Sequence, residues 1–129
     1  MEIKEYEKII EETDVSNHAL QFYLDGMSEE SGEINGVLKR VRRGDYDTGK
    51  DTDDTKVSEI IERLGLNYVL FNFPDILNDL LDEIGDREWY TNRFLNSLGL
   101  TFMDVLERNA EKVKGRKKDG TILGKGDKR

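Results

Sequence analysis

The chain has 129 residues, with 28 acids, 20 bases and a formal net charge of −8, and it contains no cysteine and one histidine. This length predicts a single domain, and the lack of cysteine excludes disulfides, thiolate nucleophiles and cysteine-bound zinc. No apolar run approaches the roughly 18 residues of a membrane span, and the acidic N-terminal segment does not resemble a signal peptide. We therefore expect a cytoplasmic protein that does not bind membranes.

Apolar residues recur at a spacing of three to four, which predicts an all-α fold. The first expected helix covers residues 3–12. A longer helix follows over residues 17–43, with Asp14 or Ser16 as its N-cap. Gly26 weakens this second helix, so that a break near Gly26 is one option.

Residues 44–56 lack apolar periodicity and are rich in turn formers, which predicts a flexible loop. A short helix over 57–64 is expected to end at Gly65, and Pro74 suits the first turn of a helix that runs to about residue 98. Thr101 then caps a last helix that fades by Gly115, which leaves 115–129 as a basic, glycine-rich tail. The sequence thus predicts one all-α domain over residues 1–129, a helical bundle of four to five helices.

Two acid pairs stand out, Glu30-Ser-Gly-Glu33 and Glu83-Ile-Gly-Asp86. The three-residue spacing places each pair on one face of its helix, at the same edge of the apolar stripe. If the two stripes pack antiparallel, the four carboxylates converge, and their repulsion favours a bound cation. Carboxylate oxygens are the ligands that Mg²⁺, Mn²⁺ or Ca²⁺ prefer. By geometry alone, two solvated helix faces remain the alternative.

The bases gather at the C-terminal end. Residues 112–129 hold eight bases and two acids, a local charge of +6, so the other 111 residues carry −14. The acidic part repels nucleic acid, whereas the basic end, with Lys112 and Arg116, could hold the phosphate chain of a nucleotide. A solvated charged tail is the alternative. Arg40, Arg42 and Arg43 could likewise steer phosphate, or they could simply be solvated at the end of their helix.

In these features the sequence resembles the MazG-like, all-α nucleoside triphosphate pyrophosphohydrolases. Their ExxE and ExxD motifs match the two acid pairs, and GD-x-x-WY, LERN-x-x-K and GDxR follow in the family's order. The resemblance covers most of residues 17–129. It departs from the family in a spacer of 49 residues between Glu33 and Glu83, and in the pair Arg87 and Glu88. Glu88 falls on the apolar arc of its helix, which indicates a subunit contact or a salt bridge.

The resemblance implies Mg²⁺-dependent hydrolysis of a (deoxy)nucleoside triphosphate to the monophosphate and pyrophosphate, with Mn²⁺ as a substitute, by a homodimer or homotetramer. It implies that the metal ligands and catalytic residues are Glu30, Glu33, Glu83 and Asp86. Glu29 would be a neighbouring acid or the proton acceptor. The implied substrate-binding residues are Tyr90 near the base or sugar, then Asn109 and Lys112, and finally Lys125, Asp127 and Arg129 over the phosphates, beside Arg116 from the basic end.

Two other functions remain open. A non-catalytic, acidic helical module could bind a protein partner through its apolar stripes. A nucleic-acid-binding protein could use the basic end, but the acidic part of the chain and the scarcity of aromatic residues in that end serve stable nucleic-acid binding poorly. Trp89 and Tyr90 could stack on a base, although core or interface packing explains Trp89 equally well.

Overall fold

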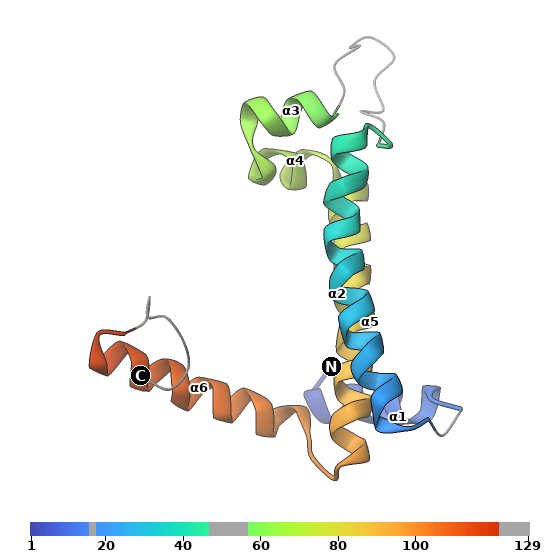
Figure 1. The fold of residues 1–129 in the computed structure, drawn as a ribbon, viewed down its shortest axis with the longest axis vertical. Coiled ribbons are helices and arrows are strands. Elements are labelled where there is room, and N and C mark those ends of the chain that lie inside the picture. The colour runs from blue at the N-terminus through green and yellow to red at the C-terminus, as the bar shows by residue number, and fades with distance from the viewer. Residues whose placement is uncertain (16–17, 47–56, 122–129) are drawn as a thin grey trace. The chain divides into compact units, whose positions relative to one another are not determined.

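The computed structural model describes residues 1–15, 18–46 and 57–121 and is all-α over these residues, as predicted. They form six helices and no strand (Figure 1). In chain order the helices are α1 (Ile3–Thr13), α2 (Leu20–Arg43), α3 (Val57–Leu64), α4 (Leu66–Asn72), α5 (Pro74–Ser97) and α6 (Phe102–Asp119). None of these helices is long and apolar enough to cross a membrane.

Several predicted helix ends are confirmed by the backbone. Gly65 and Gly99 adopt positive φ angles of 88° and 73° where their helices end. Thr101 forms a reciprocal capping box with Asp104: its hydroxyl accepts a hydrogen bond from the Asp104 backbone N–H, and the Asp104 side chain accepts one from the Thr101 N–H. Such caps satisfy backbone donors that have no partner within the helix.

Three expectations about the helices were wrong. Helix α6 does not fade at Gly115 but runs to Asp119, because a single glycine costs a helix only about 1 kcal/mol and bases in its last turn favour the helix dipole. Asp14 does not cap α2; it is the C-cap of α1, and α2 begins at Leu20. The additional helix, α4, was not expected at all. Some predictions fall on residues outside the described ones. These are the alternative N-cap Ser16, the predicted helix start at residue 17, most of the predicted loop (47–56) and residues 122–129 of the predicted tail.

Helix α2 continues through Gly26 without the break that the sequence allowed. Gly26 is buried, and a Cβ atom built on it would lie 2.2 Å from Cδ1 of Tyr90 on α5. The glycine is therefore used for close packing of two helices and not for a bend.

The chain divides into two compact units, one formed by Gln21–Tyr90 and the other by Met1–Leu20 with Thr91–Arg129. In the first unit, helices α2 to α5 share a core in which Tyr46 and other apolar side chains pack around five buried residues. These are Val37, Val41, Val57, Val69 and Ile76. Successive contacts pair Gly26 with Tyr90, Glu30 with Asp86 and Tyr46 with Asp79. Because the residue number falls along α5 as it rises along α2, the two helices run antiparallel, which meets the condition for the acid pairs to converge.

The second unit is held by contacts between residues far apart in the sequence. Nε of Arg93 donates a 2.7 Å hydrogen bond to Asp14, and the side chains are only 15% and 2% exposed. The Glu7 carboxylate accepts a hydrogen bond from the Phe102 backbone N–H at 2.7 Å. These polar contacts join α1 to the end of α5 and the start of α6.

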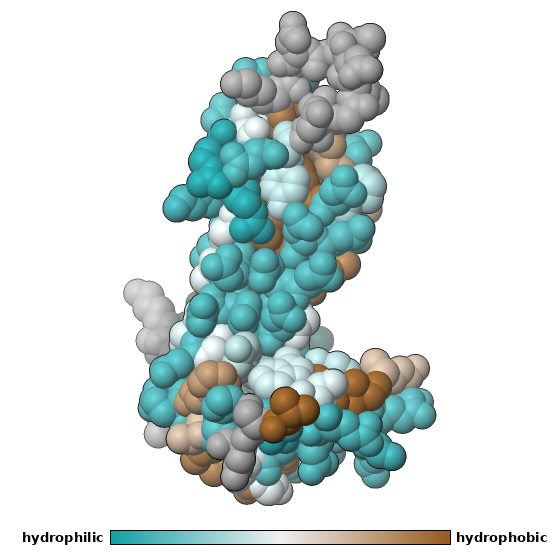
Figure 2. Space-filling view, turned by 90° about the vertical axis from the view of Figure 1, so that its right-hand side faces the viewer, coloured by the Kyte–Doolittle hydropathy of each residue, from teal (hydrophilic) through white to brown (hydrophobic). Residues whose placement is uncertain are grey.

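On the face drawn in Figure 2, hydrophilic residues cover the larger part and hydrophobic ones form small patches. This follows from a composition in which 37% of the residues are charged.

Candidate metal centre

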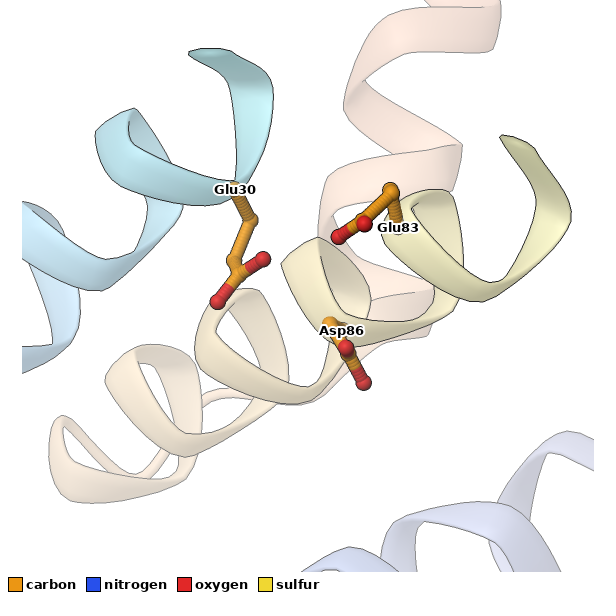
Figure 3. Close-up of side chains that lie close together, drawn as sticks. All are labelled: Glu30, Glu83 and Asp86. Carbon is orange, nitrogen blue, oxygen red and sulfur yellow. The ribbon is translucent and has the colours of Figure 1, made fainter. Parts of the chain in front are cut away.

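Three of the four predicted metal ligands lie together in the Gln21–Tyr90 unit. Glu30 comes from α2, and Glu83 and Asp86 come from successive turns of α5. One carboxylate oxygen from each lies within 4.8 Å of the others. Figure 3 shows Glu30 extending from α2 toward the face of α5 that carries Glu83 and Asp86. We call these three residues the acidic cluster.

The cluster carries unfavourable electrostatic energy. Burial raises the pKa of Glu30 above its ordinary value, and the neighbouring charges of Asp86, Glu83, Glu29 and Glu33 raise it further. Carboxylates in this position are stabilised either by a proton or by a cation. A divalent cation with a preference for oxygen ligands fits the donor set, because all the converging atoms are carboxylate oxygens.

The fourth predicted ligand, Glu33, is not part of this cluster. Its Oε2 atom lies 3.8 Å from Nη1 of Arg40, and its side chain is 52% exposed. Both groups lie over Gly36, where an added Cβ would be 3.1 Å from Oε2 of Glu33. Arg40 also reaches across to α5, with Nη2 at 3.9 Å from Oε1 of Glu83. The Arg40 guanidinium therefore lies between the Glu33 carboxylate and the acidic cluster.

Aromatic side chains lie beside the cluster. Glu30, Asp86, Trp89 and Tyr90 line a cavity of about 330 Å³. The ring of Tyr90 packs edge-on against Trp89 with 5.1 Å between ring centroids. Burial raises the pKa of the Tyr90 hydroxyl, as do nearby carboxylates led by Glu30. The two interpretations of Trp89 are thus both compatible with its position, because it contacts other rings and also faces this cavity.

The remaining predicted substrate residues belong to the other unit or lie outside the described residues. Asn109 and Lys112 are exposed on α6, and Arg116 is half-buried there. Lys125, Asp127 and Arg129 lie outside the described residues. For all six, a role in substrate binding stays a prediction.

Two polar contacts near the cluster were not predicted from the sequence. The Tyr46 hydroxyl donates a 2.6 Å hydrogen bond to Asp79, and a hydrogen bond with Tyr46 raises the pKa of Arg40. The ion pair between Glu33 and Arg40 was also missed, although Arg40 follows Glu33 by seven residues, or about two helical turns, so helical spacing could have identified it. The salt bridge proposed for Glu88 is present, with 2.9 Å between its Oε1 and Nη2 of Arg87.

The fold and this site define an all-α protein with a carboxylate cluster between two antiparallel helices. No family model matches the chain, and no solved structure matches it. The chain is 30% identical to the Gene 37 protein of Mycobacterium phage L5 over 114 residues, which cover 88% of this chain and 80% of the phage protein. The chain therefore belongs to the family of that phage protein. Its similarity to MazG-like enzymes stays a prediction.

Proposed function

We propose that the chain is a Mg²⁺-dependent nucleotide pyrophosphohydrolase that converts (deoxy)nucleoside triphosphates to monophosphates and pyrophosphate. The observation that supports this proposal best is the convergence of Glu30, Glu83 and Asp86 from two antiparallel helices. These are three of the four positions at which the ExxE and ExxD resemblance puts metal ligands. Such an enzyme would remove excess or non-canonical deoxynucleotides in the cytoplasm.

In this proposal the acidic cluster holds the metal, and Mn²⁺ could replace Mg²⁺. A bound divalent cation would neutralise charge on phosphate oxygens and lower the pKa of a bound water. In the proposed reaction, water would attack the α-phosphorus, the bond from that phosphorus to the α,β-bridging oxygen would break, and pyrophosphate would leave. Glu29 is the residue we assign to accept the proton of the attacking water, because it is an exposed acid next to Glu30.

The cavity beside the cluster is the proposed place for the base or sugar. Tyr90 and Trp89 present aromatic surface there, and Glu30 and Asp86 form the side that faces the metal. An aromatic wall next to charged ligands suits a nucleoside, because the base can stack while its phosphates reach the cation. The family resemblance would add Asn109, Lys112, Arg116, Lys125, Asp127 and Arg129 as further substrate contacts, in a homodimer or homotetramer.

The decisive experiment measures pyrophosphate release from a panel of nucleoside and deoxynucleoside triphosphates with Mg²⁺ or Mn²⁺. Asp86→Asn and Glu83→Gln should each lower activity by at least about 100-fold, since even residues that only support metal ligands cost 10–100-fold. Glu62→Gln, at an exposed acid on α3, is the matched control and should retain activity. Circular dichroism checks that every variant stays helical. Absence of pyrophosphate release across the whole panel would refute the proposal.

A second candidate is a non-catalytic module that binds a protein partner. It is favoured by α6, in which no residue is buried. Met103, Val105, Leu106 and Val113 of this helix are each about 40% exposed. The two functions differ in one cheap observation: the module would bind its partner equally well with Asp86→Asn and in EDTA, whereas the enzyme would lose its metal-dependent activity in both cases.

A further inference from the structure

The second half of α2 carries a basic groove next to the acidic cluster. Four bases line it, Lys39, Arg40, Arg42 and Arg43, and its volume is about 530 Å³. Gly32 and Gly36 also line the groove, and an added Cβ at Gly32 would meet nothing within 4 Å. The groove is thus open along α2, with positive charge at one end and Glu33 at the other.

Two of these four charges are directly available to a ligand. Lys39 and Arg42 are exposed, and no ion pair is found for either of them within the described ranges 1–15, 18–46 and 57–121. Arg43 is paired with its near neighbour Asp45, to which its Nε donates at 2.9 Å. Interaction with the helix dipole alone would account for bases in a last turn. It does not account for Arg40, which turns toward α5.

The Arg40 side chain has a hydrogen bond to Tyr46 and two longer ion pairs, to Glu33 and Glu83. The guanidinium donates a hydrogen bond to the oxygen of Tyr46, which raises the pKa of Arg40, and the Tyr46 hydroxyl itself donates to Asp79. The distances of 3.8 Å to Glu33 and 3.9 Å to Glu83 are longer than the 2.7–3.2 Å of N–H···O hydrogen bonds. Arg40 therefore has charge and donors directed at carboxylates that it does not bind tightly, and its side chain is 33% exposed.

We propose that this groove binds the phosphate chain of the nucleotide, with Arg40 as its central contact. The guanidinium balances Glu33 and Glu83 in the free protein and exchanges them for phosphate oxygens when the substrate is present. Guanidinium groups match phosphate with two parallel hydrogen bonds, which are stronger than a long ion pair to a carboxylate. This assignment rests on the proposed function, because only a nucleotide substrate would use the cluster and the groove together.

The test uses inorganic tripolyphosphate as the probe, titrated into the full chain by calorimetry, once with EDTA and once with Mg²⁺. Arg40→Gln should weaken binding by about tenfold or more, which is the effect of losing one hydrogen bond to a charged group. The double variant Lys39→Gln with Arg42→Gln should weaken it several-fold. Arg63→Gln, at an exposed arginine of α3, should leave it unchanged. Mn²⁺ binding, measured by electron spin resonance, should be at least as tight in Arg40→Gln as in the natural chain, because a competing cation is gone.

The possible results separate this inference from the proposed function. If folded Arg40→Gln binds tripolyphosphate as tightly as the natural chain, or if the natural chain does not bind it at low salt, the groove assignment is overturned. If Arg40→Gln does not fold, the exposed double variant decides, and unchanged binding overturns the assignment. If binding depends on Arg40 but no nucleotide is hydrolysed, the groove stands as a polyphosphate site and the hydrolase is refuted.

Discussion

Replacing Gly26 with alanine tests how closely α2 and α5 approach each other beside the proposed base pocket. A Cβ at this position would lie 2.2 Å from Cδ1, 2.3 Å from Cε1 and 2.6 Å from Cγ of Tyr90. Ordinary contacts between carbon atoms are about 3.5–4.0 Å. The substitution therefore forces the Tyr90 ring away from α2, and with it one wall of the cavity that Glu30 and Asp86 also line.

The magnitude follows from two opposed effects. Alanine is better than glycine in a helix interior by about 1 kcal/mol, whereas overpacking of this kind costs about 1–3 kcal/mol. Gly32→Ala, in the same helix, provides the matched control, because its Cβ would meet nothing within 4 Å and only the favourable effect remains. The free energy of unfolding should therefore be lower for Gly26→Ala than for Gly32→Ala by about 1–3 kcal/mol.

Urea unfolding followed by circular dichroism at 222 nm measures this difference, and the near-ultraviolet spectrum reports the displaced tyrosine. For an active enzyme, Gly26→Ala should raise KM above that of the natural chain, because Tyr90 is assigned to the base or sugar. Equal stability of the two variants, together with an unchanged near-ultraviolet spectrum, would refute the close packing of Gly26 against Tyr90.

Two further predictions concern polar contacts. Arg93→Ala should lower the free energy of unfolding by about 3–5 kcal/mol, because it leaves the Asp14 carboxylate, 2% exposed, without its arginine; chemical denaturation measures this, and a loss below about 1 kcal/mol, the value of a surface pair, would contradict it. Tyr46→Phe should cost about 1.5–3 kcal/mol at neutral pH, the value of a hydrogen bond to a charged group, through the lost hydrogen bond to the Asp79 carboxylate. Burial raises the Tyr46 pKa above 10.0 in the folded chain, so this hydroxyl contributes stability that is complete below 10.0 and is lost as the pH rises through the raised pKa. Stability measured from pH 8 to 11 should thus fall less steeply for Tyr46→Phe, and parallel profiles would contradict that sign.

The sequence predicted those parts of the fold that depend on local signals. Gly65, Gly99 and Thr101 act on the backbone next to them, and their helices end and begin where the pattern placed them. Helix α4 was missed because its seven residues, LNYVLFN, are too few to display helical periodicity. The effect of Gly26 was left open for a different reason: what decides it is the Tyr90 side chain, 64 positions away in the sequence, which no local pattern contains.

The candidate site shows the same division. Helical phase and an antiparallel arrangement are sufficient to bring Glu30, Glu83 and Asp86 together. The phase was available from the spacing of the acids, whereas the antiparallel arrangement entered only as a condition. The side-chain direction of Glu33 could not be predicted from spacing, because the rotamer of an exposed glutamate depends on its neighbours. Its neighbour is Arg40, which the sequence offered as either a phosphate-steering residue or a solvated helix end.

The charges along α2 argue for a ligand that carries charge of both signs. If the acidic cluster only bound a structural cation, the open bases of the adjoining groove would have no counterpart on the described part of the unit. If the bases of the groove only interacted with the helix dipole, that interaction would not explain why the Arg40 side chain extends toward Glu83 on α5. A nucleotide with its divalent cation would fit both the acidic cluster and the basic groove. The cation would replace the charge of Arg40 beside Glu83, and the phosphates of the nucleotide would give Arg40 a stronger partner. Binding of metal and of polyphosphate should then be cooperative, which a site for either one alone would not require.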